Sequence, residues 1–308
     1  MPLEYAGDRY TSLQEYIAGR QQLALRGQDS APLYATPVDA WIVKSLNSTP
    51  MRSIFSRAMD SLVSLEFGLL LSNSIAINQR SFPDIYEVLA HCSRTLGIPV
   101  PHAVTQQQDR GMFNAFTAGT DDYAFIAISA ALCQYFSRDE ACFVVGHECG
   151  HIACRHAMYQ TLVQILTDAS IVALAGPSLL LLMAARVPLL AWSRRAEVTG
   201  DRAGLLCCGD LEVAERALLR LVTGLADPDR VDIEDYLRRA QTAEEFHKLG
   251  RFDALLATHP MIPKRIAALR LFARSEPYYT LSGKSPPPTV VPLTRQELDQ
   301  RVAQIVRP

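Results

Sequence analysis

Two histidines four residues apart, His147 and His151 in the stretch HECGH, constrain the fold more than any other feature of the sequence. A capping box at Ser137–Glu140 stands ahead of an apolar run and predicts a helix that continues to about Met158. The spacing of four puts both imidazoles on one face of that helix, one turn apart. The pair can therefore bind a zinc ion through ring nitrogens, with Glu148 beside the metal as general base.

The surroundings of the motif favour a metal site over a pair of solvated histidines. Apolar side chains flank the motif at Val144, Val145, Ile152 and Ala153. Two histidines in such a setting need a buried partner, because a polar group that loses water must be compensated. A catalytic zinc ion also requires a third protein ligand and an open position for water.

The next candidate ligand is Glu197, in the stretch Ser193–Asp201 (SRRAEVTGD). Glu197 and Asp201 are four residues apart on a predicted helix and so share a face. A carboxylate on the metal, with a second carboxylate one turn away that accepts a ring N–H from a ligand histidine, is expected around such a site. Ordinary ion pairing with Arg194 or Arg202 is the alternative for both carboxylates.

Composition excludes several classes of protein. Of the 308 residues 49% are hydrophobic and 20% are charged, which excludes a disordered chain. The 30 basic and 32 acidic residues give a net charge of −2, which argues against nucleic acid as a partner. The N-terminal stretch has no basic region followed by an apolar run, so no signal peptide is expected. Seven cysteines cannot all pair, and reduced thiols in a cytoplasmic protein are expected.

The apolar excess is concentrated in Ala169–Trp192 (ASIVALAGPSLLLLMAARVPLLAW), and a membrane span needs ~20 such residues. Three breaks weaken that interpretation: Gly176-Pro177, Arg186 and Pro188. A single span would also place His151 and Glu197 on opposite sides of a bilayer, where they could not share a metal ion. We therefore predict a helical hairpin, broken near Gly176-Pro177, that packs on the metal-binding domain or dips into a membrane surface.

The rest of the pattern predicts a mostly helical α+β chain with a small sheet. Residues Met1–Thr49 are mixed and predict irregular structure. Strands are expected at His102–Gln107 and Tyr123–Ser129, with turns at Gly111 and Gly119 between them. Helices are expected at Arg52–Asn73, Pro83–Leu96, Ser193–Cys208, Val213–Leu225, Val231–Leu249, Pro263–Arg274 and Arg295–Val306.

Four collinear motifs, which together cover about Pro83–Leu271, are typical of one family. They are Asn114-Ala115-Phe116, then His147–His151, then Ser193, Arg194 and Glu197 with Asp201 at the expected offset, then Thr258, His259 and Pro260 followed by Arg265 and Ile266. On these motifs the chain resembles the HtpX-like and CAAX prenyl endopeptidase zinc metallopeptidases (metallopeptidase family 48), which are gluzincins. Two positions depart from the family pattern and neither is an expected ligand: Gly200, where alanine is usual, and Met261, where a second proline is common.

The resemblance implies a gluzincin-like catalytic domain, mostly helical with a small β-sheet, that binds one Zn²⁺ per chain. His147, His151 and Glu197 would be the metal ligands. Asp201 would orient His147 from behind. Glu148 would act as general base on the zinc-bound water, which attacks a peptide carbonyl.

The resemblance also implies a substrate-binding rim. His259 would lie across the cleft and stabilise the oxyanion or contact the substrate, although a histidine in a His-Pro turn is more often structural. Residues Asn114, Ala115 and Phe116 would form an edge along which an extended peptide pairs, the alternative being plain sheet core. Surface or structural roles are expected for the histidines without partner spacing: His91, His102, His156 and His247.

Three regions are expected: an N-terminal helical extension over 1–80, a zinc metallopeptidase domain over 81–275 that contains the apolar hairpin 160–192, and a proline-containing tail over 276–308. The expected function is zinc-dependent endopeptidase action on flexible or unfolded polypeptides. A non-catalytic zincin-like scaffold that binds proteins is the alternative, but a scaffold has no need of Glu148. Further hypotheses are a peripheral membrane contact through 169–192, and latency in which the extension or the tail covers the cleft.

Overall fold

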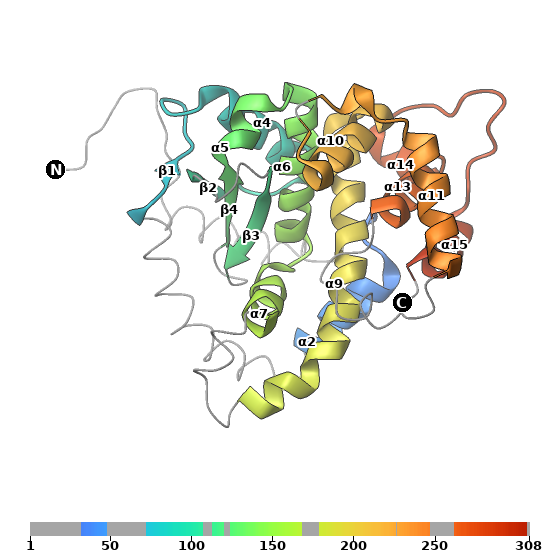
Figure 1. Ribbon diagram of the computed structural model, residues 1–308, viewed down its shortest axis with the longest axis horizontal. Helices are drawn as coiled ribbons and strands as arrows, with labels where there is room; N and C mark the ends of the chain where they lie inside the picture. The colour runs from blue at the N-terminus through green and yellow to red at the C-terminus, as the bar shows by residue number, and fades with distance from the viewer. Residues whose placement is uncertain are drawn as a thin grey trace.

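Two helices that pack side by side form the centre of the molecule. The computed structural model describes residues 32–47, 72–106, 113–119, 124–167, 179–225, 227–246 and 262–306. Helix α6 (Arg138–Ala153) begins at the predicted capping box, which forms with both of its hydrogen bonds. It lies against α9 (Leu179–Cys208), and Figure 1 shows the two helices crossing between the sheet and the C-terminal helices. Almost every α6 side chain from Glu140 to Ile152 is buried.

A four-stranded mixed sheet covers one side of α6. Its strands are β1 (Ile75–Ala76), β2 (His102–Gln106), β3 (Ala115–Gly119) and β4 (Ala124–Ser129), in the order β1-β2-β4-β3. Strands β2 and β4 are parallel, whereas β1 pairs with β2 and β3 pairs with β4 in the antiparallel direction. All six residues of β4 are buried. The predictions of β2 and β4 are confirmed to within one residue, but β3 was expected only as part of a rim.

The other helices cover both sides of the central pair. Helix α4 (Pro83–Leu96) has the predicted bounds, with proline in its first turn and Gly97 as C-cap at a φ of 69°. The short helix α5 (Ala130–Tyr135) lies between β4 and α6, and the 3-10 helix η2 (Pro228–Arg230) lies between two longer helices. The remaining helices are α10 (Leu211–Thr223), α11 (Ile233–Phe246), α13 (Ile262–Ala273), α14 (Glu276–Ser282) and α15 (Arg295–Ile305). Four of these five helices were predicted, and α10, α11, α13 and α15 lie within three residues of the predicted bounds, whereas α14 was not predicted. The α+β class is confirmed.

The helix that carries the HECGH motif is shorter than predicted. It ends at Ala153, not near Met158, and α7 (Ala157–Thr167) begins after a turn. Arg155 adopts the left-handed conformation with a φ of 60°, which interrupts the helix. The backbone N–H of His156 then donates to the carbonyl of His151 at 2.9 Å. The backbone conformation and hydrogen bonding at Arg155 and His156 therefore end α6, although the apolar sequence pattern continues beyond Ala153.

The prediction that Pro188 breaks the apolar segment is wrong, because α9 runs through it from Leu179 to Cys208. A proline removes only one helical N–H, and the side chains that follow it on α9 are packed. After Pro188, the buried side chains of Leu189, Leu190 and Trp192 pack on buried side chains of α7: Met158, Tyr159, Leu162 and Val163. The expected break at Gly176-Pro177 lies outside the described residues. Within the described residues, no helix combines the length and apolar character that crossing a membrane requires.

The N-terminal part of the chain is more regular than predicted. Helix α2 (Pro37–Asn47), drawn in blue in Figure 1, forms where irregular structure was expected. Proline at its first position and Asp39 in its first turn both favour a helix start. The N–H of Thr36 donates to Thr199 on α9, so the beginning of α2 is fixed to the central helix. The predicted helix Arg52–Asn73 lies outside the described residues except at its end.

Candidate metal centre and cleft

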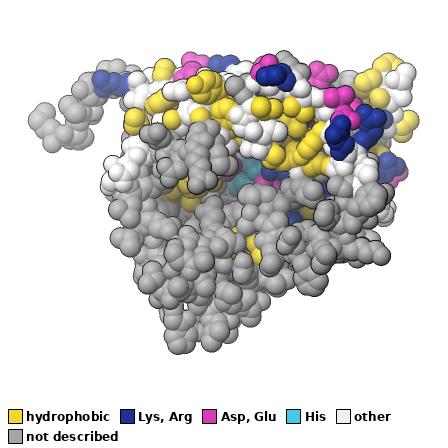
Figure 2. All heavy atoms as spheres, viewed as in Figure 1, with side chains coloured by type: hydrophobic (Ala, Val, Ile, Leu, Met, Phe, Trp, Pro, Cys, Tyr) yellow, Lys and Arg dark blue, Asp and Glu magenta, His cyan; other side chains and the backbone are white. Residues whose placement is uncertain are grey.

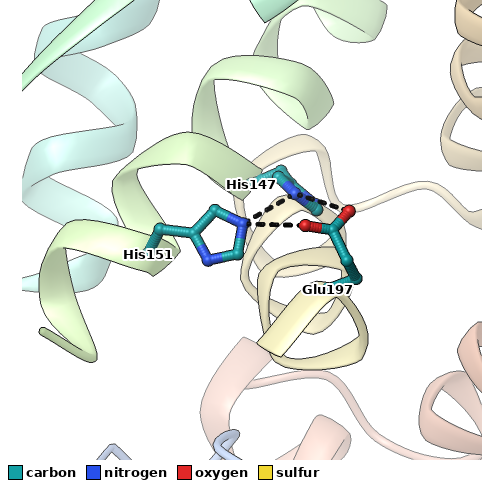
Figure 3. A group of neighbouring side chains, drawn as sticks. All are labelled: His147, His151 and Glu197. Carbon is teal, nitrogen blue, oxygen red and sulfur yellow. Dashed lines mark hydrogen bonds and ion pairs between the residues drawn. The ribbon is translucent and has the colours of Figure 1, made fainter. Parts of the chain in front are cut away.

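Helix α6 presents its two motif histidines to the same point. His147 and His151 are 6% and 3% exposed, and their Nε2 atoms lie 3.1 Å apart. Glu197 reaches them from α9, with one carboxylate oxygen 3.7 Å from Nε2 of His147 and the other 3.5 Å from Nε2 of His151. Figure 3 shows the three side chains pointing toward one another from the two helices.

The donor set fits a divalent metal ion of the zinc type. One ligand atom from each of His147, His151 and Glu197 lies within 4.8 Å of the others, and all three residues are buried. Two imidazoles and one carboxylate form a three-ligand set that leaves the fourth position open, as catalytic zinc sites do. Burial alone would lower the pKa of His151, but the neighbouring Glu197 carboxylate raises it, so the site favours positive charge.

Asp201 lies behind His147, in contact with its ring. Its Oδ1 lies 3.0 Å from Nδ1 of His147, on the side of the ring away from Glu197. Arg265 on α13 donates to both Asp201 oxygens, at 2.8 and 2.6 Å, and its third nitrogen lies 3.1 Å from Glu197. Burial would raise the pKa of Asp201, but Arg265 and His147 outweigh burial and hold it below its usual value. Asp201 is therefore a carboxylate that accepts hydrogen bonds only.

His151 has an equivalent partner that the sequence did not reveal. Nδ1 of His156 lies 2.9 Å from Nδ1 of His151, and His156 is fully buried. Burial lowers the pKa of His156 in spite of the nearby Asp39 carboxylate, which favours the neutral ring. The sequence predicted a surface or structural role for His156 and did not indicate this contact with a candidate ligand. The left-handed turn at Arg155 makes this contact, and no local pattern predicts that turn.

The side chain of Glu148 points to strand β3. The hydroxyl of Thr117 donates to Oε2 of Glu148 at 2.6 Å and lies 3.1 Å from the Glu148 carbonyl oxygen. Glu148 is 6% exposed and stands beside the two histidines. Thr117 was not singled out from the sequence, because nothing in a single threonine indicates a contact with a residue 31 positions away.

These groups lie along a cleft of about 590 Å³. Figure 2 shows histidine surface, coloured cyan, exposed in a hollow near the middle of this face. The predicted rim residues Asn114, Ala115 and Phe116 line the cleft together with Thr117, so the structure brings them to the candidate metal ligands. Apolar lining comes from Phe113, Phe143, Val144, Leu221, Val222 and Ile262. His259 lies outside the described residues.

The cysteines contribute no ligand to this centre within the described part of the chain. All seven are free thiols, and Cys149 inside the motif is fully buried. Burial raises the pKa of Cys149 well above its usual value, so its thiol stays protonated and packs in the core. This agrees with the expectation of reduced, buried thiols.

Comparison with known proteins agrees with this geometry. The model of peptidase family M48 matches residues 79–273. The chain belongs to peptidase family M48. It is also 26% identical over 258 residues to the plastoglobule-localized metallopeptidase 48 of the chloroplast of Arabidopsis thaliana, a match that covers 80% of this chain and 73% of the relative. No solved structure matches the chain. Membership in a metallopeptidase family supports a metal-dependent peptidase, and the expected family is confirmed.

Proposed function

We propose that this M48 protein is a zinc-dependent endopeptidase that cleaves flexible or unfolded polypeptides. The observation that carries the proposal is the buried group of His147, His151 and Glu197 beside Glu148 in a cleft lined by strand β3. The three ligands would hold one zinc ion, which would supply Lewis-acid polarisation of a peptide carbonyl and a more acidic water.

Glu148 is the proposed general base. Thr117 holds Oε2 through its hydroxyl, so we assign Oε1 to accept the proton of the attacking water. The same oxygen then returns the proton to the amine that leaves. The low exposure of Glu148, 6%, limits exchange of that proton with bulk water.

The shape of the cleft supports an extended peptide as substrate. Strand β3 is at an edge of the described sheet and lines the cleft at Ala115, Phe116 and Thr117. An extended peptide that pairs with such an edge is bound through its backbone and needs no particular sequence. Only a flexible or unfolded chain exposes its backbone in this way.

The decisive experiment is cleavage of an unfolded protein by wild type and by Glu148→Gln, with zinc measured in both. The amide keeps the shape of the side chain but cannot accept a proton, so we expect zinc to stay bound and cleavage to fall at least about 1,000-fold. A chelator should abolish wild-type cleavage and added zinc should restore it. Glu212→Gln, at an exposed position of α10, is the matched control and should cleave normally.

Two results would contradict the proposal. Zinc bound at one per chain without any cleavage that depends on Glu148 would favour the non-catalytic scaffold. Wild-type protein that binds no zinc would remove the metal centre altogether. A peripheral membrane contact through 169–192 stays a prediction, since residues 169–178 lie outside the described part.

A further inference from the structure

The partner that orients His151 is itself held by a residue outside the family match. Asp39 on α2 is fully buried, and its Oδ2 lies 3.1 Å from Nε2 of His156. The indole N–H of Trp192 on α9 donates to Oδ1 of Asp39 at 2.7 Å. Neither Oδ2 of Asp39 nor Nε2 of His156 makes a well-aligned hydrogen bond to any described residue, so the contact between them rests on its short distance and on charge. Burial would raise the pKa of Asp39, but His156 and Thr199 help to hold it below its usual value.

One assignment of the ring hydrogens connects Asp39, through His156, to the candidate metal ligand His151. A carboxylate only accepts hydrogen bonds, so Asp39 takes the N–H of Trp192 on one oxygen and faces an N–H of His156 on the other. A neutral His156 with its hydrogen on Nε2 leaves Nδ1 as an acceptor for the Nδ1–H of His151. Nε2 of His151 then keeps its lone pair, and this atom faces His147 and Glu197.

The arrangement mirrors the one behind the first histidine. His147 is oriented by Asp201 directly, at 3.0 Å. His151 is oriented by Asp39 through His156, at 2.9 and 3.1 Å. In both cases a buried carboxylate fixes the ring tautomer that presents Nε2 to a metal.

We propose that Asp39 and His156 are positioning residues for His151, so that helix α2, which precedes residues 79–273 of the family match, completes the metal centre. The inference rests on the proposed zinc site. A purely structural role explains the pair less well, because an apolar pair of similar volume would fill the space without burying a carboxylate. Helix α2 acts from behind the site, since none of the described residues of 32–47 lines the cleft.

The test measures zinc affinity in the full-length chain by competition with a chelator, and the melting temperature of the same metal-free proteins. Asp39→Asn keeps the side-chain volume, and Asp39→Ala removes the carboxylate. Both should weaken zinc binding, by about 10- to 100-fold for the alanine variant. Asp210→Ala is the control, because it removes the side chain that caps α10 at an exposed position and accepts from the N–H groups of Glu212 and Val213. It should lower the melting temperature and leave zinc affinity unchanged.

The alternatives give different results. Zinc affinity within twofold of wild type in both Asp39 variants, with a lower melting temperature, would mean a structural role and would overturn the inference alone. If Asp39→Ala does not fold, Asp39→Asn and His156→Gln decide the same question. Wild-type protein without zinc would overturn the proposed function and the inference with it.

Discussion

Each functional side chain of the cleft is held by a partner from a different element. His147 is held by Asp201 of α9, and Glu148 by Thr117 of β3. Such contacts select one rotamer and, for a histidine, one tautomer. At the scale of single residues, the site therefore depends on groups that take no part in the chemistry.

Thr117→Val tests this for Glu148, the proposed general base. Valine keeps the shape but removes the hydroxyl that donates to Glu148, and a hydrogen bond to a charged group contributes about 1.5–3 kcal/mol. We expect kcat/KM for an unfolded protein to fall by about 10- to 100-fold, with zinc content unchanged. Thr117→Ser keeps the hydroxyl and should retain most of the activity. Equal activity of the valine and serine variants would show that the hydrogen bond is dispensable.

At the scale of elements, the close crossing of α6 and α9 brings the ligands together. Glycines permit it, because a Cβ on Gly146 would lie 2.6 Å from Cβ of Cys207, and one on Gly204 would lie 2.6 Å from the Phe143 carbonyl oxygen. Gly200, where the family usually has alanine, has the same explanation. A Cβ there would lie 2.7 Å from Cε1 of His147.

Gly204→Ala tests the crossing. Alanine gains about 1 kcal/mol of helix propensity, but overpacking against backbone costs about 1–3 kcal/mol. We expect a lower melting temperature and at least tenfold weaker zinc binding, since Glu197 moves away with α9. Arg195→Ala, on the same helix, is the control because the Arg195 side chain donates to the Ala191 carbonyl oxygen of its own helix. A Gly204→Ala protein that is more stable and binds zinc normally would contradict the tight crossing.

At the scale of the whole molecule, both described ends of the chain belong to the fold. Thr36 and Asp39 are fixed to α9. In the tail, Tyr278, Leu298 and Val302 are buried in the main core. None of the described residues of 276–306 lines the cleft. The tail is therefore expected to stabilise the fold, and the hypothesis of a tail that holds the enzyme latent gains no support from its position.

Truncation before Glu276 tests the role of the tail. It removes four buried core side chains, Val306 with the three named above, each of which contributes about 1.5–3 kcal/mol through burial. We expect a much lower melting temperature, or aggregation, and no gain in cleavage of an unfolded protein. A truncated protein that keeps the wild-type melting temperature and cleaves faster would show instead that the tail is inhibitory.

What could be predicted from the sequence is what short-range patterns encode. The capping box located the start of α6, and the prolines at 83, 99 and 101 indicated the bounds of α4. Spacing of four along a helix placed His147 with His151 on one face. The left-handed turn at Arg155 was missed, because it is set by packing and not by a turn residue such as glycine. The same holds for α2, whose helix is fixed by contacts to α9.

The sequence by itself determined that His147 and His151 share one face of α6 as candidate ligands, and it named Glu197 and Asp201 as the carboxylates to meet them, because residue type and helical period are local. Only the tertiary structure decided which groups hold these side chains. Thr117 lies 31 positions from Glu148, and His156 lies five positions from His151, beyond the end of its helix. Asp39 lies more than 100 positions before His151. Their hydrogen bonds arise where separate elements pack, and a pattern within one element cannot encode them.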